Sequence, residues 1–156
     1  MKKLIILLLA ALFAVGTAFA DENEYFIICK PGTTVNVREK PKMRSEVIAA
    51  KSFGDMVISD GEEKNGFVHV VGLAAEVEDG WIYKGLLVQD KPVEVNMLSQ
   101  VYNGRVAARQ YADGKIIRWL KDGSEVRVFA TSQEWCVTEY GFVKTDYLTI
   151  NARVSQ

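Results

Sequence analysis

Apolar and polar residues alternate with a period of two along most of this chain. In the stretch 35–38 two valines fall on one side and Asn36 and Arg38 on the other, and the stretches 67–70, 125–129 and 135–138 repeat this pattern. Such alternation is typical of strands that bury one face and leave the other in water, whereas helical periodicity is scarce here. The pattern therefore predicts an all-β fold of short strands.

Clusters of turn-forming residues separate these apolar runs. Glycine tolerates positive φ, and Asn and Asp side chains bond their own backbone, so such clusters reverse the chain easily. The clusters are Lys30-Pro31-Gly32, Phe53-Gly54-Asp55, Glu63-Lys64-Asn65-Gly66, Glu78-Asp79-Gly80, Asp113-Gly114 and Asp122-Gly123. Short β-branched and aromatic runs between turns of this kind indicate a small all-β protein.

The second half of the chain repeats the pattern of the first. Val47 and Val57 are ten positions apart, as are Ile116 and Val126, and a glycine stands three positions before Val57 and before Val126. Self-similarity at such a spacing indicates a duplicated structural unit of about sixty residues. We therefore predict two small domains side by side.

We expect the first domain at residues 25–88 and the second at residues 93–151. The join, Gln89-Asp90-Lys91-Pro92, is short and polar, and its proline stops a strand from running through. Each unit is shorter than the roughly 70–80 residues at which one core is comfortably stable, so contact between the domains would help both. The stretch 71–79 is longer than its counterpart at 139–140, which predicts a larger hairpin or loop in the first domain.

Residues 1–20 have the three regions of a secretory signal peptide. Lys2 and Lys3 are followed by an apolar run from Leu4 to Val15, and Ala18-Phe19-Ala20 is a small-x-small cleavage signal. The apolar run is shorter than the ~20 residues that a membrane span requires, and no other stretch is long enough. We expect cleavage near Ala20, export to the periplasm, cell wall or medium, and no stable membrane insertion of the mature chain.

The charge of the mature chain is mild and mixed. From residue 21 onward it carries 17 Lys and Arg against 20 Asp and Glu, a net charge of −3 with the one histidine neutral. Nucleic acids and anionic membranes favour basic patches, so this balance gives no electrostatic reason to bind either. We expect no nucleic-acid partner.

Several motifs of the first repeat stand in a fixed order. They are Asn36-Val37-Arg38, Pro41, Val47-Ile48, Gly54 with Val57, Phe67, and Gly80-Trp81-Ile82. In this order they resemble a bacterial SH3 domain. The second repeat departs from the pattern, because Ala107-Ala108 replaces Asn-Val, no proline follows Arg109, and Phe142 replaces the tryptophan. Its Gly123, Trp135 and the ending 141–148 still fit.

The resemblance covers nearly all of the mature chain. It implies two small SH3-like barrels in tandem, each strongly bent and built of about five to seven strands. Exported modules of this family bind cell-wall peptides or serve as targeting units of peptidoglycan hydrolases, and others mediate contacts with unidentified ligands. The family's usual catalytic companion would need a third domain, and we expect none because the two repeats take up the mature chain.

Cys136 and His69 invite a nucleophile–base interpretation, because an adjacent imidazole activates a thiolate. They lie in different repeats without a recognisable orienting residue, and a cysteine on a strand is more often a buried apolar side chain. We therefore expect no enzyme activity. We also expect no cofactor or metal, because one histidine and two distant cysteines lack ligand spacing. Export permits a disulfide between Cys29 and Cys136, but free, buried thiols are the favoured interpretation.

Aromatic side chains are the better candidates for binding. Phe67, Trp81, Trp135 and Phe142 lie on predicted strands, where we expect them to fill the small cores. Exposed rings near an arginine would form a groove for an extended peptide, with the guanidinium binding a carboxylate through two hydrogen bonds. The residues predicted for such a groove are Arg38, Tyr83, Arg109, Tyr111, Trp119 and Tyr147.

The favoured hypothesis is an exported, non-catalytic binding module that recognises a cell-wall peptide or a segment of an envelope protein through these aromatic grooves. The alternative is a structural or regulatory partner of one specific exported protein, with the cleft between the domains as its interface. For Arg38 and Arg109, the alternative role is a solvated strand face with a local ion pair.

Overall fold

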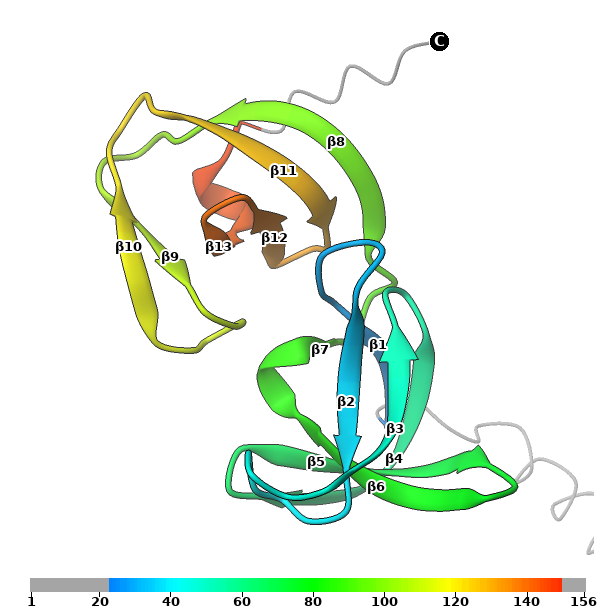
Figure 1. Cartoon of the computed structure of the whole chain (residues 1–156). Helices are drawn as coiled ribbons and strands as arrows, with labels where there is room; N and C mark the ends of the chain where they lie inside the picture. Colours follow the sequence, from blue (N-terminus) through cyan, green and yellow to red (C-terminus); the bar gives the residue numbers. More distant parts are fainter. Residues whose placement is uncertain (1–22, 150–156) are drawn as a thin grey trace, which may run out of the picture.

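The computed structural model describes residues 23–149 and consists almost entirely of β-structure (Figure 1). Within this range the strands form two sheets, and there is no α-helix, only two short 3-10 turns. The prediction of an all-β chain with two small β units is confirmed. None of the described residues forms a helix with the length and hydropathy needed to cross a bilayer. The predicted signal peptide, residues 1–20, lies outside the described residues, as do positions 150 and 151.

The first sheet has seven strands in the order β3-β2-β6-β5-β4-β1-β7. They are β1 (Glu24–Ile27), β2 (Thr34–Arg38), β3 (Val47–Ser52), β4 (Met56–Lys64), β5 (Phe67–Ala74), β6 (Val77–Tyr83) and β7 (Leu87–Val88), and the 3-10 turn η1 (Lys84–Leu86) precedes β7. The β5–β6 hairpin extends to the pair Ala74 and Val77. The larger hairpin predicted for residues 71–79 is therefore confirmed.

The second sheet has six strands in the order β10-β9-β13-β12-β11-β8. They are β8 (Val93–Gln100), β9 (Val106–Arg109), β10 (Ile116–Leu120), β11 (Glu125–Thr131), β12 (Trp135–Thr138) and β13 (Gly141–Lys144), followed by η2 (Thr145–Tyr147). This order matches the first sheet strand for strand, except that β7 has no counterpart. The register agrees too, because Arg38 pairs with Trp81 as Arg109 pairs with Phe142.

Each sheet curves around its own apolar core. Alternate residues of β5, Val68 and Val70, point into the first core, and alternate residues of β11, Val126 and Val128, point into the second. All four are fully buried. Burying one such side chain contributes about 1.5–3 kcal/mol, so the period-two pattern of the sequence supplies the main stabilisation of each sheet.

A third apolar cluster joins the two sheets. Ile28 and Val88 come from the first sheet's part of the chain, and Trp135, Val137 and Phe142 come from the second. Trp135 and Val137 of β12 lie in this cluster, while Cys136 of the same strand points into the second core. Both faces of β12 are therefore buried. The alternation along β12 predicts one wet face, but the first sheet covers that face.

Polar contacts also connect the two units. The N–H of Gln133 donates to Oδ2 of Asp90 at 2.8 Å. Lys30 lies in the loop between β1 and β2, which reaches toward the second sheet (Figure 1), and its Nζ is 4.6 Å from the ring centroid of Phe129. The short join and these contacts together hold the two sheets against each other.

Candidate functional site: the cavity between the two sheets

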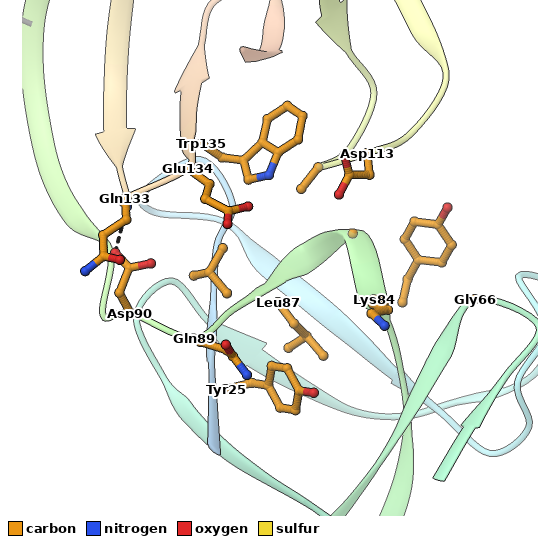
Figure 2. Close-up of a pocket in the computed structure, with 14 residues that line it drawn as sticks. Tyr25, Gly66, Lys84, Leu87, Gln89, Asp90, Asp113, Gln133, Glu134 and Trp135 are labelled. Atoms are coloured by element: carbon orange, nitrogen blue, oxygen red, sulfur yellow. Dashed lines mark hydrogen bonds between the residues drawn. The ribbon is translucent and has the colours of Figure 1, made fainter. Parts of the chain in front are cut away.

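A cavity of about 720 Å³ lies where the two sheets meet (Figure 2). Its walls come from β1, from the segment 83–90 that contains η1 and β7, and from the turns at residues 112–113 and 133–135 of the second sheet. Ligand pockets typically measure about 300–1,000 Å³, so this volume suits a small ligand or a short piece of extended peptide.

Gly85 brings the two sheets close together at this cavity. Its carbonyl oxygen accepts a hydrogen bond from the N–H of Ala112 at 3.1 Å. A Cβ at position 85 would lie 2.7 Å from Cβ of Tyr111 and 2.9 Å from the carbonyl oxygen of Ala112. Only glycine permits so close an approach, because it has no side chain to collide. Beside it, the rings of Tyr83 and Tyr111 pack with centroids 4.9 Å apart.

Trp135 is the large aromatic residue that β12 contributes to the cavity. A tight turn fixes its backbone, because its carbonyl oxygen accepts from the N–H of Ser132 at 2.8 Å and its N–H donates to the Ser132 hydroxyl at 3.1 Å. Figure 2 shows the ring between Glu134 and Asp113, with the indole nitrogen on the cavity side. No residue in the range 23–149 accepts a hydrogen bond from that N–H, so it is free to donate to a ligand.

The cavity carries charges of both signs. Nζ of Lys84 donates to both carboxylate oxygens of Glu63 at 2.8 Å, and Asp90 is engaged with a backbone N–H as described above. Asp113 and Glu134 are exposed, and neither forms an ion pair with another described residue. Their carboxylates can therefore accept hydrogen bonds from the N–H groups of a ligand.

The two predicted arginines brace turns of their own sheets. Nη1 of Arg38 donates to the carbonyl oxygen of Ser45 at 2.9 Å, and Nη1 of Arg109 donates to that of Gly114 at 2.8 Å. Both side chains are half-buried, and neither lines the cavity. The equivalent positions of the two repeats thus have the same contact.

The remaining predicted residues are divided between three places. Tyr83 lines the cavity, and Tyr111 packs against it. Trp119 lies on β10 with 47% of its surface exposed, and Tyr147 lies in η2 with 37% exposed. Of the six predicted residues, the cavity takes in Tyr83 alone, and the other five line none of it.

Both cysteines are free and buried, as the sequence favours. Cys136 is fully buried, and its Sγ lies 3.5 Å from the hydroxyl of Thr131 and 3.6 Å from that of Thr145. Burial raises the pKa of the Cys136 thiol and also that of Cys29. Reactive cysteines have a lowered pKa and access to solvent, so these two have the properties of structural residues.

His69 belongs to an ion-pair cluster that the sequence analysis missed. Its Nδ1 lies 2.7 Å from Oδ2 of Asp60, its Nε2 lies 3.6 Å from Oδ1 of Asp79, and its ring centroid is 4.8 Å from that of Trp81. Burial disfavours the charged ring, but the hydrogen bond and charge of Asp60, together with Asp79, outweigh it and raise the pKa of His69. Hydrogen bonds lower the pKa of Asp60. The largest effect comes from the bond with the backbone N–H of Glu62, and the next largest from the bond with the ring of His69.

Within residues 23–149, three side chains of this cluster lie close enough together to ligate a metal ion. The ligand atoms of Asp60, Glu62 and His69 all lie within 4.8 Å of one another. Asp60 and Glu62 are exposed, and Asp60 already bonds His69, so a solvated ion-pair cluster accounts for the arrangement.

Most residues of the cavity were not predicted from the sequence. Tyr25, Lys84, Asp113 and Glu134 come from four separate segments, and no spacing in the chain connects them. One signal was readable. Gly85 stands where the second repeat has Asp146, within the matching 3-10 turns, and a glycine at one copy of a repeated turn indicates a close contact there.

No protein-family model matches the chain, and no curated protein matches it either. Among solved structures it is similar to NlpC1 and NlpC2 from Trichomonas vaginalis, each with 21% sequence identity and a TM-score of 0.33. The similarity covers 85% and 81% of this chain, respectively, and 47% of each of those chains, so this chain spans less than half of their length. At a TM-score of 0.33, these structures give no basis for assigning a function to this chain.

Proposed function

We propose that this protein is an exported, non-catalytic binding module that holds a short peptide in the cavity between its two sheets. The single observation that carries the proposal is the cavity of about 720 Å³ lined by Tyr25, Tyr83 and Trp135 together with hydrogen-bonding groups. Apolar and aromatic walls with a few fixed polar groups are the usual composition of a ligand site. The ligand is a cell-wall peptide or a segment of an envelope protein.

The polar groups of the cavity favour a peptide over other ligands. A peptide backbone offers both N–H donors and carbonyl acceptors, which the carboxylates of Asp113 and Glu134 and the indole N–H of Trp135 can satisfy. Asp90 is a third carboxylate, and Lys84 supplies the one ammonium group of the lining. Three carboxylates against one ammonium disfavour a polyanion such as nucleic acid.

Cys136 and His69 are the two residues considered for catalysis, and the surroundings of each support a protein without catalytic activity. The Cys136 thiol is enclosed in the second core and its pKa is raised, which opposes thiolate formation. The His69 ring is engaged by Asp60 and Asp79 on the first sheet, rather than by a nucleophile. A binding role makes no demand on either residue.

Binding to isolated peptidoglycan sacculi tests the wall-peptide ligand. The unaltered protein should sediment with the sacculi. The double variant Asp113→Asn with Glu134→Gln should bind at least about tenfold more weakly, because each hydrogen bond to a charged acceptor, worth about 1.5–3 kcal/mol, becomes one to a neutral amide oxygen, worth about 0.5–1.5 kcal/mol. A matched control, Glu125→Gln with Asp146→Asn, removes two exposed carboxylates outside the cavity and should leave binding unchanged. Absence of binding by the unaltered protein removes the wall peptide as the ligand.

A specific exported protein is the second candidate ligand, because the cavity contacts both sheets and a loop inserted there would touch each of them. Crosslinking followed by affinity capture from an envelope fraction should return one dominant protein with the unaltered chain and with the control variant. Equal capture by the variant Asp113→Asn with Glu134→Gln would place the contact elsewhere on the molecule.

Export is tested separately from binding. Production of the full chain in a bacterial host should give an exported product whose N-terminal residue is Asp21. An uncleaved product that stays in the cytoplasm would contradict the signal peptide at residues 1–20.

A further inference from the structure

The hairpin that contains β9 and β10 is strongly basic, although the whole chain carries a net charge of −1. Residues 102–122, the two strands with the turns that flank them, contain five Lys and Arg and two acidic residues, Asp113 and Asp122. Of the five cations, Arg109 is engaged with a carbonyl oxygen of its own turn. The other four are exposed, and they are Arg105, Lys115, Arg118 and Lys121. The overall charge therefore conceals a local cationic surface.

β10 is an edge strand, and its outer side has no partner among the described residues. In the second sheet it pairs with β9 alone. The unpaired N–H and carbonyl groups of an edge strand are a template onto which another extended chain can add by hydrogen bonds. This strand (Ile116–Leu120), with its unpaired side, is called the β10 edge below.

Exposed apolar and aromatic side chains accompany these unpaired groups. Ile117 is 54% exposed and Trp119 is 47% exposed. Cζ of Arg105 lies 4.6 Å from the ring centroid of Trp119, and Cζ of Arg118 lies 4.5 Å from that of Tyr140. In each pair a guanidinium lies over an aromatic ring, and Trp, Tyr and Arg are the residue types that most often anchor interfaces.

We propose that the β10 edge binds an acidic, extended peptide segment of a partner protein by strand addition. The partner's backbone continues the sheet beyond β10, its apolar side chains cover Ile117 and Trp119, and its carboxylates meet Arg105 and Arg118. Charge complementarity selects this occupant. A second copy of the same strand is disfavoured because the pairing would bring two cationic hairpins together.

The unpaired edge favours a peptide over an anionic polymer. Nucleic acid or polyphosphate would satisfy the cations but not the row of backbone N–H and carbonyl groups. The β10 edge shares none of its proposed contacts with the cavity between the sheets, so either site can fail without the other.

The test measures binding of an octapeptide that alternates Glu with Thr or Val, blocked at both ends, by titration calorimetry and by amide chemical shifts of the whole protein. We expect the shifts to concentrate at residues 116–120. The variant Arg105→Glu with Arg118→Glu should bind at least about tenfold more weakly, since like charges suppress an encounter and opposite charges promote it. The matched control, Lys40→Glu with Lys42→Glu, changes the net charge equally at two exposed lysines of the first sheet's part of the chain and should bind normally.

Three further measurements can overturn the proposal. A peptide with proline in place of each Thr keeps the charge but loses backbone donors, so equal binding of that peptide would exclude strand addition. Equal affinity for a single-stranded oligonucleotide would show a general anion-binding surface instead. Sedimentation equilibrium that shows self-association through Trp119, abolished in Trp119→Ala, would assign the edge to a second copy. In support, the cavity variant Asp113→Asn with Glu134→Gln should bind the octapeptide as well as the unaltered protein does.

Discussion

Replacing Gly85 by alanine tests the close contact between the two sheets. The added Cβ would lie 2.7 Å from Cβ of Tyr111, 2.9 Å from the carbonyl oxygen of Ala112 and 2.9 Å from Cε1 of Tyr83. Two of these three neighbours are Cβ or backbone atoms, which cannot swing away, so the sheets must separate slightly. Overpacking of this kind costs about 1–3 kcal/mol. The shift also lengthens the hydrogen bond from Ala112 to Gly85, worth about 0.5–1.5 kcal/mol.

We expect the free energy of unfolding of Gly85→Ala to fall by about 3 kcal/mol, the middle of the range of about 1.5–4.5 kcal/mol that these two effects give. Urea unfolding followed by tryptophan fluorescence measures it, because Trp135 is buried between the sheets. Asp146 occupies the matching position of η2 and is exposed, so Asp146→Ala should change the free energy by no more than about 0.5 kcal/mol. If Gly85→Ala is as stable as the unaltered protein, the sheets do not approach each other as described.

Three further predictions concern buried or paired side chains. The imidazole of His69, the one histidine of the chain, should titrate in NMR spectra with a pKa above its ordinary value, and Asp60→Asn should bring that value down. Because the pKa of His69 is raised in the folded protein, the stability that this group contributes is fully present below the unfolded pKa and is lost as pH rises through the folded pKa. A His69→Gln variant whose free energy of unfolding falls over the same pH range as that of the unaltered protein would contradict this role of His69. Cys29 and Cys136 should react with Ellman's reagent only after unfolding, and rapid reaction of the native protein would contradict their burial. Trp135→Ala should lower the free energy of unfolding by about 3–5 kcal/mol in urea titrations, and a loss below about 1 kcal/mol would show that its ring is not packed between the sheets.

The architecture was predictable because it depends on local pattern. Alternation along 67–70 and 125–129 decides which side chains of a strand can be buried, and it needs no knowledge of the neighbouring strand. The repeat of spacings between Val47 and Val57 and between Ile116 and Val126 was readable for the same reason. The matching strand orders of the two sheets are what that repetition produces in space.

The cavity was not predictable, because it depends on how two already folded sheets meet. Residues 25, 83–90, 112–113 and 133–135 become neighbours through tertiary packing, and no period along the chain records that contact. The arginines illustrate the same limit. The sequence shows a guanidinium on a strand at positions 38 and 109, but the carbonyl oxygens that engage them belong to Ser45 and Gly114, in loops whose shape local pattern does not specify.

The burial of β12 on both faces makes the second unit depend on the first. Trp135 and Val137 are shielded by the neighbouring unit, while Cys136 serves the interior of its own. If the second unit were produced alone, the face that carries Trp135 and Val137 would be exposed to water and to other chains, which favours aggregation. The burial of Trp135 and Val137 thus depends on both units, and a protein that carries the second unit without the first loses it.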